Sequence, residues 1–289
     1  FFSTEKRKFI VADTPGHEQY TRNMVTGAST ADAAILMVDA RHGILTQTRR
    51  HSFLMSLMGM RHIIVAINKM DLVDYSKARY DQIVEEYRAF AKQLGLENIT
   101  FIPMSALKGD NVIEHSAKMP WYHGTTLMGY LEAVEVDDER LQRSPFRMPV
   151  QWVNRPNLDF RGFTGMIASG VVRPGDPIRV QPSGKTSTVS RIYTFDGDLE
   201  EAVAGQSITL LLDDEIDISR GDIISGVDQP AHTADQFETT LVWMHEAPLL
   251  PGRPYLMKLG TQLVSATVTD IKYQVNVNTL EHTAGKQLD

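Results

Sequence analysis

The chain has 289 residues, a hydrophobic fraction of 42%, a charged fraction of 22% and a formal net charge of −7. This length suggests two domains at about 150 residues each, and the ordinary composition excludes a disordered, collagen-like or coiled-coil chain. The absence of cysteine excludes disulfides, thiolate metal sites and a cysteine nucleophile within this chain, and the acidic balance does not indicate bulk attraction to nucleic acid.

The first part of the chain alternates strand and helix patterns. Apolar runs typical of buried strands cover residues 8–13, 33–39, 63–68 and 99–104. Apolar residues at helical spacing cover residues 48–59, 80–94 and 125–134. Gly59 and Gly95 stand where two of these helices are expected to end. Alternation of this kind predicts a parallel, doubly wound α/β sheet.

The pattern changes after Val136. A charged linker containing Pro145 follows, and beyond it the apolar runs are short and separated by glycine and proline turns, which favours small β-barrels. Strands are predicted over 165–168, 177–180, 207–212, 237–244 and 262–271. We therefore expect an α/β domain over 1–143, a β-barrel over 144–229 and a second, incomplete β-barrel over 230–289.

The first candidate site is the sequence Asp13-Thr14-Pro15-Gly16-His17, directly after the predicted strand 8–13. Ligands of open α/β sheets bind at the carboxyl ends of the strands. There, a carboxylate can hold Mg²⁺ through water, a glycine lets a backbone N–H approach a phosphate oxygen, and a histidine can orient an attacking water. Asp-x-x-Gly alone is equally consistent with an ordinary strand-to-helix turn.

The second candidate site is Asn68-Lys69-Met70-Asp71, at the end of the predicted strand 63–68. Guanine presents N1–H and N2–H as adjacent donors, and one carboxylate accepts both, whereas adenine lacks this pair. Asp71 would therefore select guanine, Asn68 could brace the loop and meet the base edge, and the Lys69 stem could cover the ring. Taken alone, the tetrapeptide could also be a polar turn.

The third candidate is Ser105-Ala106-Leu107, after the predicted strand 99–104, where a backbone N–H could reach guanine O6. Three such signals in this order are the layout of a P-loop GTPase. The phosphate-binding sequence Gly-x-x-x-x-Gly-Lys-Ser/Thr does not occur in the 289 residues. We expect the first strand, this loop with its helix and the first switch loop to lie upstream of Phe1.

Residues 13–17, 23–24, 26–28 and 47–49 resemble the translation-factor GTPases typified by elongation factor Tu. Residues 2–9, residues 13–24 (DTPGHEQYTRNM) and residues 149–162 resemble, more particularly, the GTP-binding large subunits of bacterial heterodimeric sulfate adenylyltransferase (CysN type). The resemblance extends over essentially the whole chain. It implies a GTPase domain followed by β-barrel domains.

This resemblance implies a regulatory GTPase subunit that binds GTP or GDP with Mg²⁺ and hydrolyses GTP. In that family, hydrolysis drives the synthesis of adenylyl sulfate and pyrophosphate from ATP and sulfate by a smaller catalytic subunit. The resemblance also gives each site residue a role. Asp13 would hold Mg²⁺ through water, Gly16 would sense the terminal phosphate, and His17 would orient the attacking water. The nucleotide-binding positions that it implies are Asp13, Thr14, Pro15, Gly16, His17, Asn68, Lys69, Met70, Asp71, Ser105, Ala106 and Leu107.

Several alternatives remain open at this point. His17 could be a switch residue that signals the nucleotide state rather than a catalytic one. The chain could also be a translation factor that binds tRNA or the ribosome, and residues 18–22 and 150–162 are the features that separate the two families. A catalytically inactive scaffold would follow if the protein lacked a phosphate loop. The expected setting is a cytoplasmic heterodimer, without a membrane segment and without nucleic acid.

Overall fold

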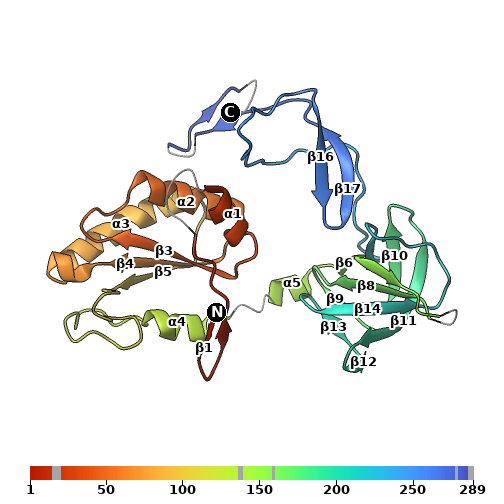
Figure 1. Ribbon diagram of the computed structural model, residues 1–289, viewed down its shortest axis with the longest axis horizontal. Helices are drawn as coiled ribbons and strands as arrows, with labels where there is room; N and C mark the ends of the chain where they lie inside the picture. Colours follow the sequence, from red (N-terminus) through yellow and green to blue (C-terminus); the bar gives the residue numbers. More distant parts are fainter. Residues whose placement is uncertain (15–20, 136–138, 158–159, 277–278, 286–289) are drawn as a thin grey trace. The chain divides into compact units, whose positions relative to one another are not determined.

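The computed structural model describes residues 1–14, 21–135, 139–157, 160–276 and 279–285. The chain divides into two compact units (Figure 1). The first, here called the α/β unit, comprises Phe1–Val136 and Lys272–Gly285, and the second, the β unit, comprises Asp137–Ile271 and Lys286–Asp289. The three-domain division at 143/144 and 229/230 stays a prediction.

The α/β unit is built on a parallel sheet, as the alternating pattern predicts. Strands β3 (Ala33–Asp39), β4 (His62–Asn68) and β5 (Ile99–Pro103) lie in the order β3-β4-β5. In Figure 1, helices α1, α2 and α3 lie on one side of this sheet and α4 on the other. Ile63, Ile64, Val65, Ala66 and Ile67 of the central strand are at most 1% exposed, because β4 has a strand on each side and helices over its faces.

The helices of the α/β unit are α1 (Thr21–Ala28), α2 (Thr46–Leu57), α3 (Lys77–Gln93) and α4 (Leu127–Ala133). The Ser76 hydroxyl caps α3 by accepting from the Arg79 N–H. Gly59 and Gly95 follow α2 and α3 with φ of 71° and 66°, a conformation that glycine adopts without steric cost. The predicted helix ends are therefore confirmed. None of the helices in the described part of the chain combines the length and hydropathy needed to cross a membrane.

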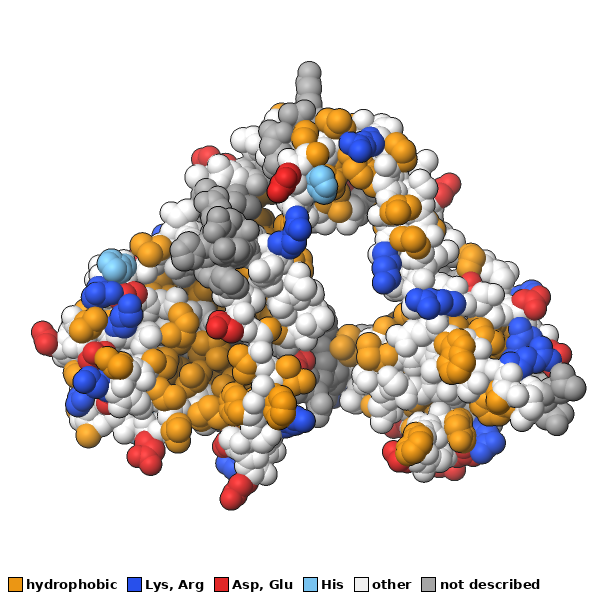
Figure 2. Space-filling model, in the orientation of Figure 1, with side chains coloured by type: hydrophobic (Ala, Val, Ile, Leu, Met, Phe, Trp, Pro, Cys, Tyr) orange, Lys and Arg blue, Asp and Glu red, His pale blue; other side chains and the backbone are white. Residues whose placement is uncertain are grey.

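The predicted strand over residues 8–13 is wrong beyond Phe9. Only Lys8–Phe9 (β2) is a strand, and it pairs with β1 (Phe2–Ser3) instead of joining the parallel sheet. Ile10 and Val11 are 89% and 61% exposed. An apolar run forms a buried strand only beside a neighbouring strand, and no described segment pairs with residues 10–13. Figure 2 shows hydrophobic side chains gathered on the visible face of the α/β unit.

The β unit begins with the short helix α5 (Glu139–Arg143) and is otherwise formed mainly by antiparallel strands. Its main sheet has the order β6-β15-β10-β11-β14-β8-β7, with β12 pairing to β11, and β9 pairs separately with β13. Since β6 and β7, at the two ends of this order, are consecutive in the chain, the sheet curls around one core. The strands are β6 (Arg147–Pro149), β7 (Trp152–Asn154), β8 (Gly162–Met166), β9 (Val171–Val172), β10 (Pro177–Gln181), β11 (Thr186–Thr194), β12 (Gly197–Leu199), β13 (Ala202–Val203), β14 (Ser207–Leu212) and β15 (Ile223–Gly226).

The core of the β unit consists of apolar side chains that alternate along these strands. Met148, Phe163, Ile178, Ile192 and Leu210 are at most 2% exposed and belong to one cluster. Because antiparallel strands with one buried face alternate inward and outward residues, the short apolar runs of the sequence are sufficient to build it. The prediction of a β-rich region after the linker is confirmed.

The last part of the chain forms two hairpins. Strand β16 (Pro254–Leu259) pairs with β17 (Gln262–Thr267), and β18 (Gln274–Val275) pairs with β19 (His282–Thr283). The strand predicted over 262–271 is thus confirmed up to Thr267. The strand predicted over 237–244 is wrong, since these residues pair with no described strand and Phe237 is 59% exposed.

Candidate functional site

The carboxyl ends of three neighbouring strands meet at one edge of the parallel sheet. The register pairs Asp39 of β3 with Asn68 of β4, and Ile67 of β4 with Pro103 of β5. Backbone hydrogen bonds tie the loops that follow. The Ala40 N–H donates to the Asn68 carbonyl at 2.9 Å, and the N–H of Met104, next after Pro103, donates to the Ile67 carbonyl at 2.8 Å. The second and third candidate sequences therefore lie side by side, together with the segment after β3.

Asn68 joins two of these loops through one oxygen. Its Oδ1 accepts the Lys69 N–H at 2.8 Å and the Ala106 N–H at 2.9 Å. The Ala106 N–H, a candidate donor to guanine O6, is thus engaged with Asn68. The N–H of the neighbouring Leu107 donates to no acceptor among the described residues, and the Leu107 side chain is 84% exposed.

Met70 and Ser105 anchor the loops from below. Both residues are 0% exposed. The Met70 N–H donates to the Met104 carbonyl at 3.1 Å, and Ser105 accepts the Lys108 N–H through its hydroxyl at 3.3 Å. These two predicted site residues therefore hold the loop backbones in place.

Asp71 lies in the first turn of the short 3-10 helix η2 (Met70–Val73). Its side chain is half-buried, and in the described part of the chain no group donates a hydrogen bond to its carboxylate. A carboxylate held in this way can accept two N–H donors from a ligand.

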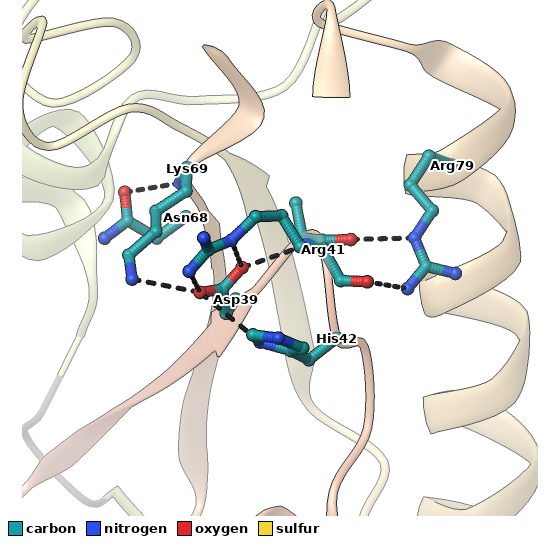
Figure 3. A network of polar contacts seen from close by, with 7 residues as sticks. Asp39, Arg41, His42, Asn68, Lys69 and Arg79 are labelled. Atoms are coloured by element: carbon teal, nitrogen blue, oxygen red, sulfur yellow. Dashed lines mark hydrogen bonds and ion pairs between the residues drawn. The ribbon is translucent and has the colours of Figure 1, made fainter. Parts of the chain in front are cut away.

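Lys69 is held in the left-handed backbone conformation, with φ of 65°. Its ammonium group lies 2.9 Å from the Asp39 carboxylate, which also accepts from the Arg41 guanidinium at 3.0 and 2.6 Å (Figure 3). Hydrogen bonding to Arg41, and secondarily to Lys69, holds the pKa of Asp39 far below its ordinary value. Asp39 and Arg41 were not identified as site residues from the sequence. The available signal was a carboxylate at the end of a second apolar strand.

The first candidate sequence is only partly described. Asp13 is exposed, and Thr14 packs against α1, since a Cβ on Gly27 would lie 3.1 Å from Thr14 Cγ2. Pro15, Gly16 and His17 lie outside the described residues. Within the described ranges no three carboxylate or imidazole groups converge on a metal position. A lone exposed carboxylate suits only a well-hydrated cation that it holds through water, as Mg²⁺ permits.

A shallow cavity in the described part of the chain lies elsewhere. It is lined by the end of α3 and the start of β5, including Arg88, Lys92 and Phe101, and so it lies toward the amino ends of the parallel strands. In open α/β sheets ligands bind at the opposite edge. We therefore place the candidate site at the loops after β3, β4 and β5.

Three family models match the chain. They are the elongation factor Tu GTP binding domain over residues 1–142, elongation factor Tu domain 2 over residues 163–225, and the GTP-eEF1A C-terminal domain-like family over residues 236–289. These matches confirm the predicted fold class of a GTPase-type α/β domain followed by β domains. The structure of sup35 complexed with GMPPNP is similar at 24% identity and a TM-score of 0.44, over 99% of this chain and 71% of that chain.

The chain is similar over its whole length to several curated proteins. It is 57% identical to sulfate adenylyltransferase subunit 1 of Alteromonas mediterranea and 54% identical to that of Saccharophagus degradans, and it covers 61% of each. It is 56% identical to the bifunctional enzyme NodQ of Rhizobium sp. (strain N33) and covers 45% of that protein. The chain thus spans roughly half to three-fifths of the length of these relatives.

Proposed function

Residues 1–142 belong to the family of elongation factor Tu GTP binding domains, and from this premise we propose that the chain is part of the regulatory GTPase subunit of a sulfate adenylyltransferase. In this proposal GTP hydrolysis drives the synthesis of adenylyl sulfate and pyrophosphate from ATP and sulfate. A smaller catalytic subunit carries out that reaction. The name "subunit 1", which two of these relatives bear, supports the existence of such a partner.

The observation that carries the proposal is the hydrogen bond from the Ala106 N–H to Asn68, which joins the loop that contains Asp71 to the loop that contains Leu107. The Asp71 carboxylate would accept N1–H and N2–H of guanine, and the Leu107 N–H would donate to guanine O6. Asn68 already fixes the spacing of the two loops through its shared oxygen. The exposed stem of Lys69 would cover the ring.

The phosphate side of the proposed site rests on the first candidate sequence. Mg²⁺, when bound, would neutralise charge that develops on the phosphates, and Asp13 would hold it through water. We propose that the backbone at Thr14, Pro15 and Gly16 approaches the terminal phosphate. His17 would orient the attacking water.

Changing Asp71 to Asn tests guanine recognition. An amide cannot accept both guanine donors, so GTP affinity should fall by about 10- to 100-fold, while xanthosine triphosphate should bind better. Equilibrium titration of the full-length protein measures both. Asp74→Asn, an exposed change in the same loop, is the matched control. Unchanged GTP affinity in Asp71→Asn would refute the assignment.

Changing His17 to Ala tests the catalytic role. Loss of an oriented water should slow single-turnover GTP hydrolysis by roughly 10²- to 10⁴-fold, with a much smaller loss of GTP affinity. Hydrolysis at the wild-type rate would show that His17 acts at most as a switch residue.

A pull-down with the full-length protein tests the biological role. Capture of a small nucleotide-binding subunit, with GTP-stimulated formation of adenylyl sulfate, is the expected result. Capture of tRNA or ribosomes without that activity would favour a translation-factor function instead.

A further inference from the structure

Asp39 lies one strand away from the proposed guanine loop and contacts it through an ion pair. Its Oδ2 lies 2.9 Å from the Lys69 ammonium; Asp39 ends β3, and Lys69 directly follows the last residue of the neighbouring parallel strand β4. No sequence motif indicates a role for Asp39. Figure 3 shows the side chains of Lys69, Arg41 and His42 all directed at the Asp39 carboxylate.

The Asp39 carboxylate is held in its charged form by the Arg41 guanidinium and the Lys69 ammonium. Arg41 donates to it from Nε, from Nη2 and from its backbone N–H, the last at 2.9 Å. His42 Nδ1 lies 3.6 Å from the same carboxylate, and the Asp39 side chain is only 19% exposed. Hydrogen bonds between charged partners are the stronger kind, and here they fix both oxygens.

The backbone that carries Asp39 and Arg41 is itself clamped from α3. Arg79 donates from Nε to the Ala40 carbonyl at 2.7 Å and from Nη2 to the Arg41 carbonyl at 3.2 Å. Gly43 closes the loop with φ of 72°, and a Cβ there would lie 3.0 Å from Arg79 Nη2. The backbone next to Asp39 is therefore hydrogen-bonded to both β4 and α3, which fixes the position of the Asp39 carboxylate.

We propose that Asp39 is a positioning residue that acts through Lys69. The Lys69 side chain is 46% exposed while its ammonium is paired with Asp39, so part of the held side chain is open to a ligand. A free lysine populates many rotamers, and ordering it on ligand binding costs conformational entropy. Asp39 removes most of this cost in advance by holding the stem as one wall of the base site. The inference rests on the proposed guanine site.

The variant Asp39→Asn keeps the size of the side chain and removes its charge. GTP affinity should fall by about 3- to 10-fold, which corresponds to the cost of ordering one long side chain. GDP affinity should fall by the same factor, because Lys69 would contact the base and not the phosphates. The rate of GTP hydrolysis at saturating GTP should be unchanged. Asp39→Glu, which retains a carboxylate, should restore part of the affinity.

The matched control is Asp81→Asn, which removes the same charge from the exposed Lys77–Asp81 pair of α3 and should leave GTP affinity unchanged. Equilibrium titration of the full-length protein, with thermal unfolding to verify folding, supplies each value.

A double-mutant cycle with Lys69→Met separates positioning from a general structural role. If Asp39 acts through Lys69, Asp39→Asn should weaken GTP no further in the Lys69→Met background. The inference would be overturned if Asp39→Asn lowered GTP affinity equally in the wild-type and Lys69→Met backgrounds, or if it did not lower GTP affinity in the wild-type background. Absence of GTP binding by the wild-type protein in the same titration would instead refute the proposed function.

Discussion

The parallel sheet of the α/β unit and the antiparallel sheet of the β unit use polar residues differently. In the α/β unit Asp39, Lys69 and Asn68 contact one another at a single edge of the sheet. In the β unit, charged pairs such as Arg191–Asp198 connect adjacent strands on the surface, where such pairs contribute little stability. All parallel strands deliver their carboxyl ends to one edge, whereas antiparallel strands alternate. The difference explains why the candidate site forms on the first sheet only.

The interiors of the two units both combine an apolar core with hydrogen-bonded polar groups. The α/β unit buries the Ser52–Tyr87 hydroxyl pair and Asn111. In the β unit Ser225 is 0% exposed and donates to the Arg179 carbonyl at 3.1 Å, and a cluster of apolar side chains forms the core. We expect the loss of buried apolar volume to cost more than the loss of a buried hydrogen bond, and a change in one unit to leave the other unit folded. The following changes test this contrast in decreasing order of effect.

Phe163→Ala should have the largest effect. The side chain is 2% exposed in the core of the β unit, so its removal leaves a cavity and should lower the free energy of unfolding by about 3–5 kcal/mol. Hydrogen exchange resolved by peptide should show lost protection in the β unit only. Phe195→Ala, at a fully exposed phenylalanine of the same unit, is the control and should change little. Equal loss of protection in both units would show that the change is not confined to the core of the β unit.

Asn111→Ala should come second. Asn111 is 1% exposed, donates to the Pro103 carbonyl and accepts the Ser116 N–H, each at 2.8 Å. Its φ of 56° also suits asparagine better than alanine. Two buried backbone groups would lose their partners, which should destabilise the α/β unit by roughly 2–4 kcal/mol. Denaturant unfolding measures this loss. A loss below 1 kcal/mol would contradict the hydrogen-bond account.

Ser52→Ala should have a smaller effect. It leaves the fully buried Tyr87 hydroxyl without its 2.8 Å partner and should cost about 1–2 kcal/mol. Adding Tyr87→Phe removes the orphaned hydroxyl, so the double variant should recover part of the loss. Denaturant unfolding of both variants checks this, and strictly additive losses would contradict it.

The smallest effect concerns His51. Burial, reinforced by the charge of Arg50, lowers the pKa of His51 below its ordinary 6.5. As the pH falls, His51 is therefore protonated in the unfolded chain before it is protonated in the folded one. Its protonation does not reduce the free energy of unfolding above about pH 6.5, and reduces it progressively as the pH drops below that value. His51→Gln should reduce the difference in melting temperature between pH 7.5 and pH 5.5. An unchanged difference would show that His51 does not contribute.

Much of the fold could be predicted because its signals are local. The apolar run of β4 predicts a buried strand, and the glycines after α2 and α3 predict the ends of those helices, each from the residues of that segment alone. The apolar run over residues 8–13 wrongly predicted a strand of the parallel sheet. Strand formation also depends on a neighbouring strand, which a local pattern does not reveal. The same limitation applies to residues 237–244.

The candidate site divides in the same way. Asn68, Lys69 and Asp71 are contiguous, so their motif was visible in the sequence. Asp39 and Arg79 enter through contacts that span 30 and 39 residues, and only the register of β3 with β4 and the docking of α3 bring them together. The roles of Pro15, Gly16 and His17 stay predictions.

The single oxygen with which Asn68 accepts two N–H groups has a consequence for motion. The loop after β4 and the loop after β5 share one hydrogen-bond acceptor, so we expect their displacements to be correlated. A ligand that contacts both loops would then incur the entropy of immobilising them once rather than twice. Asn68 would in this way let two separate segments of the chain act as one receptor.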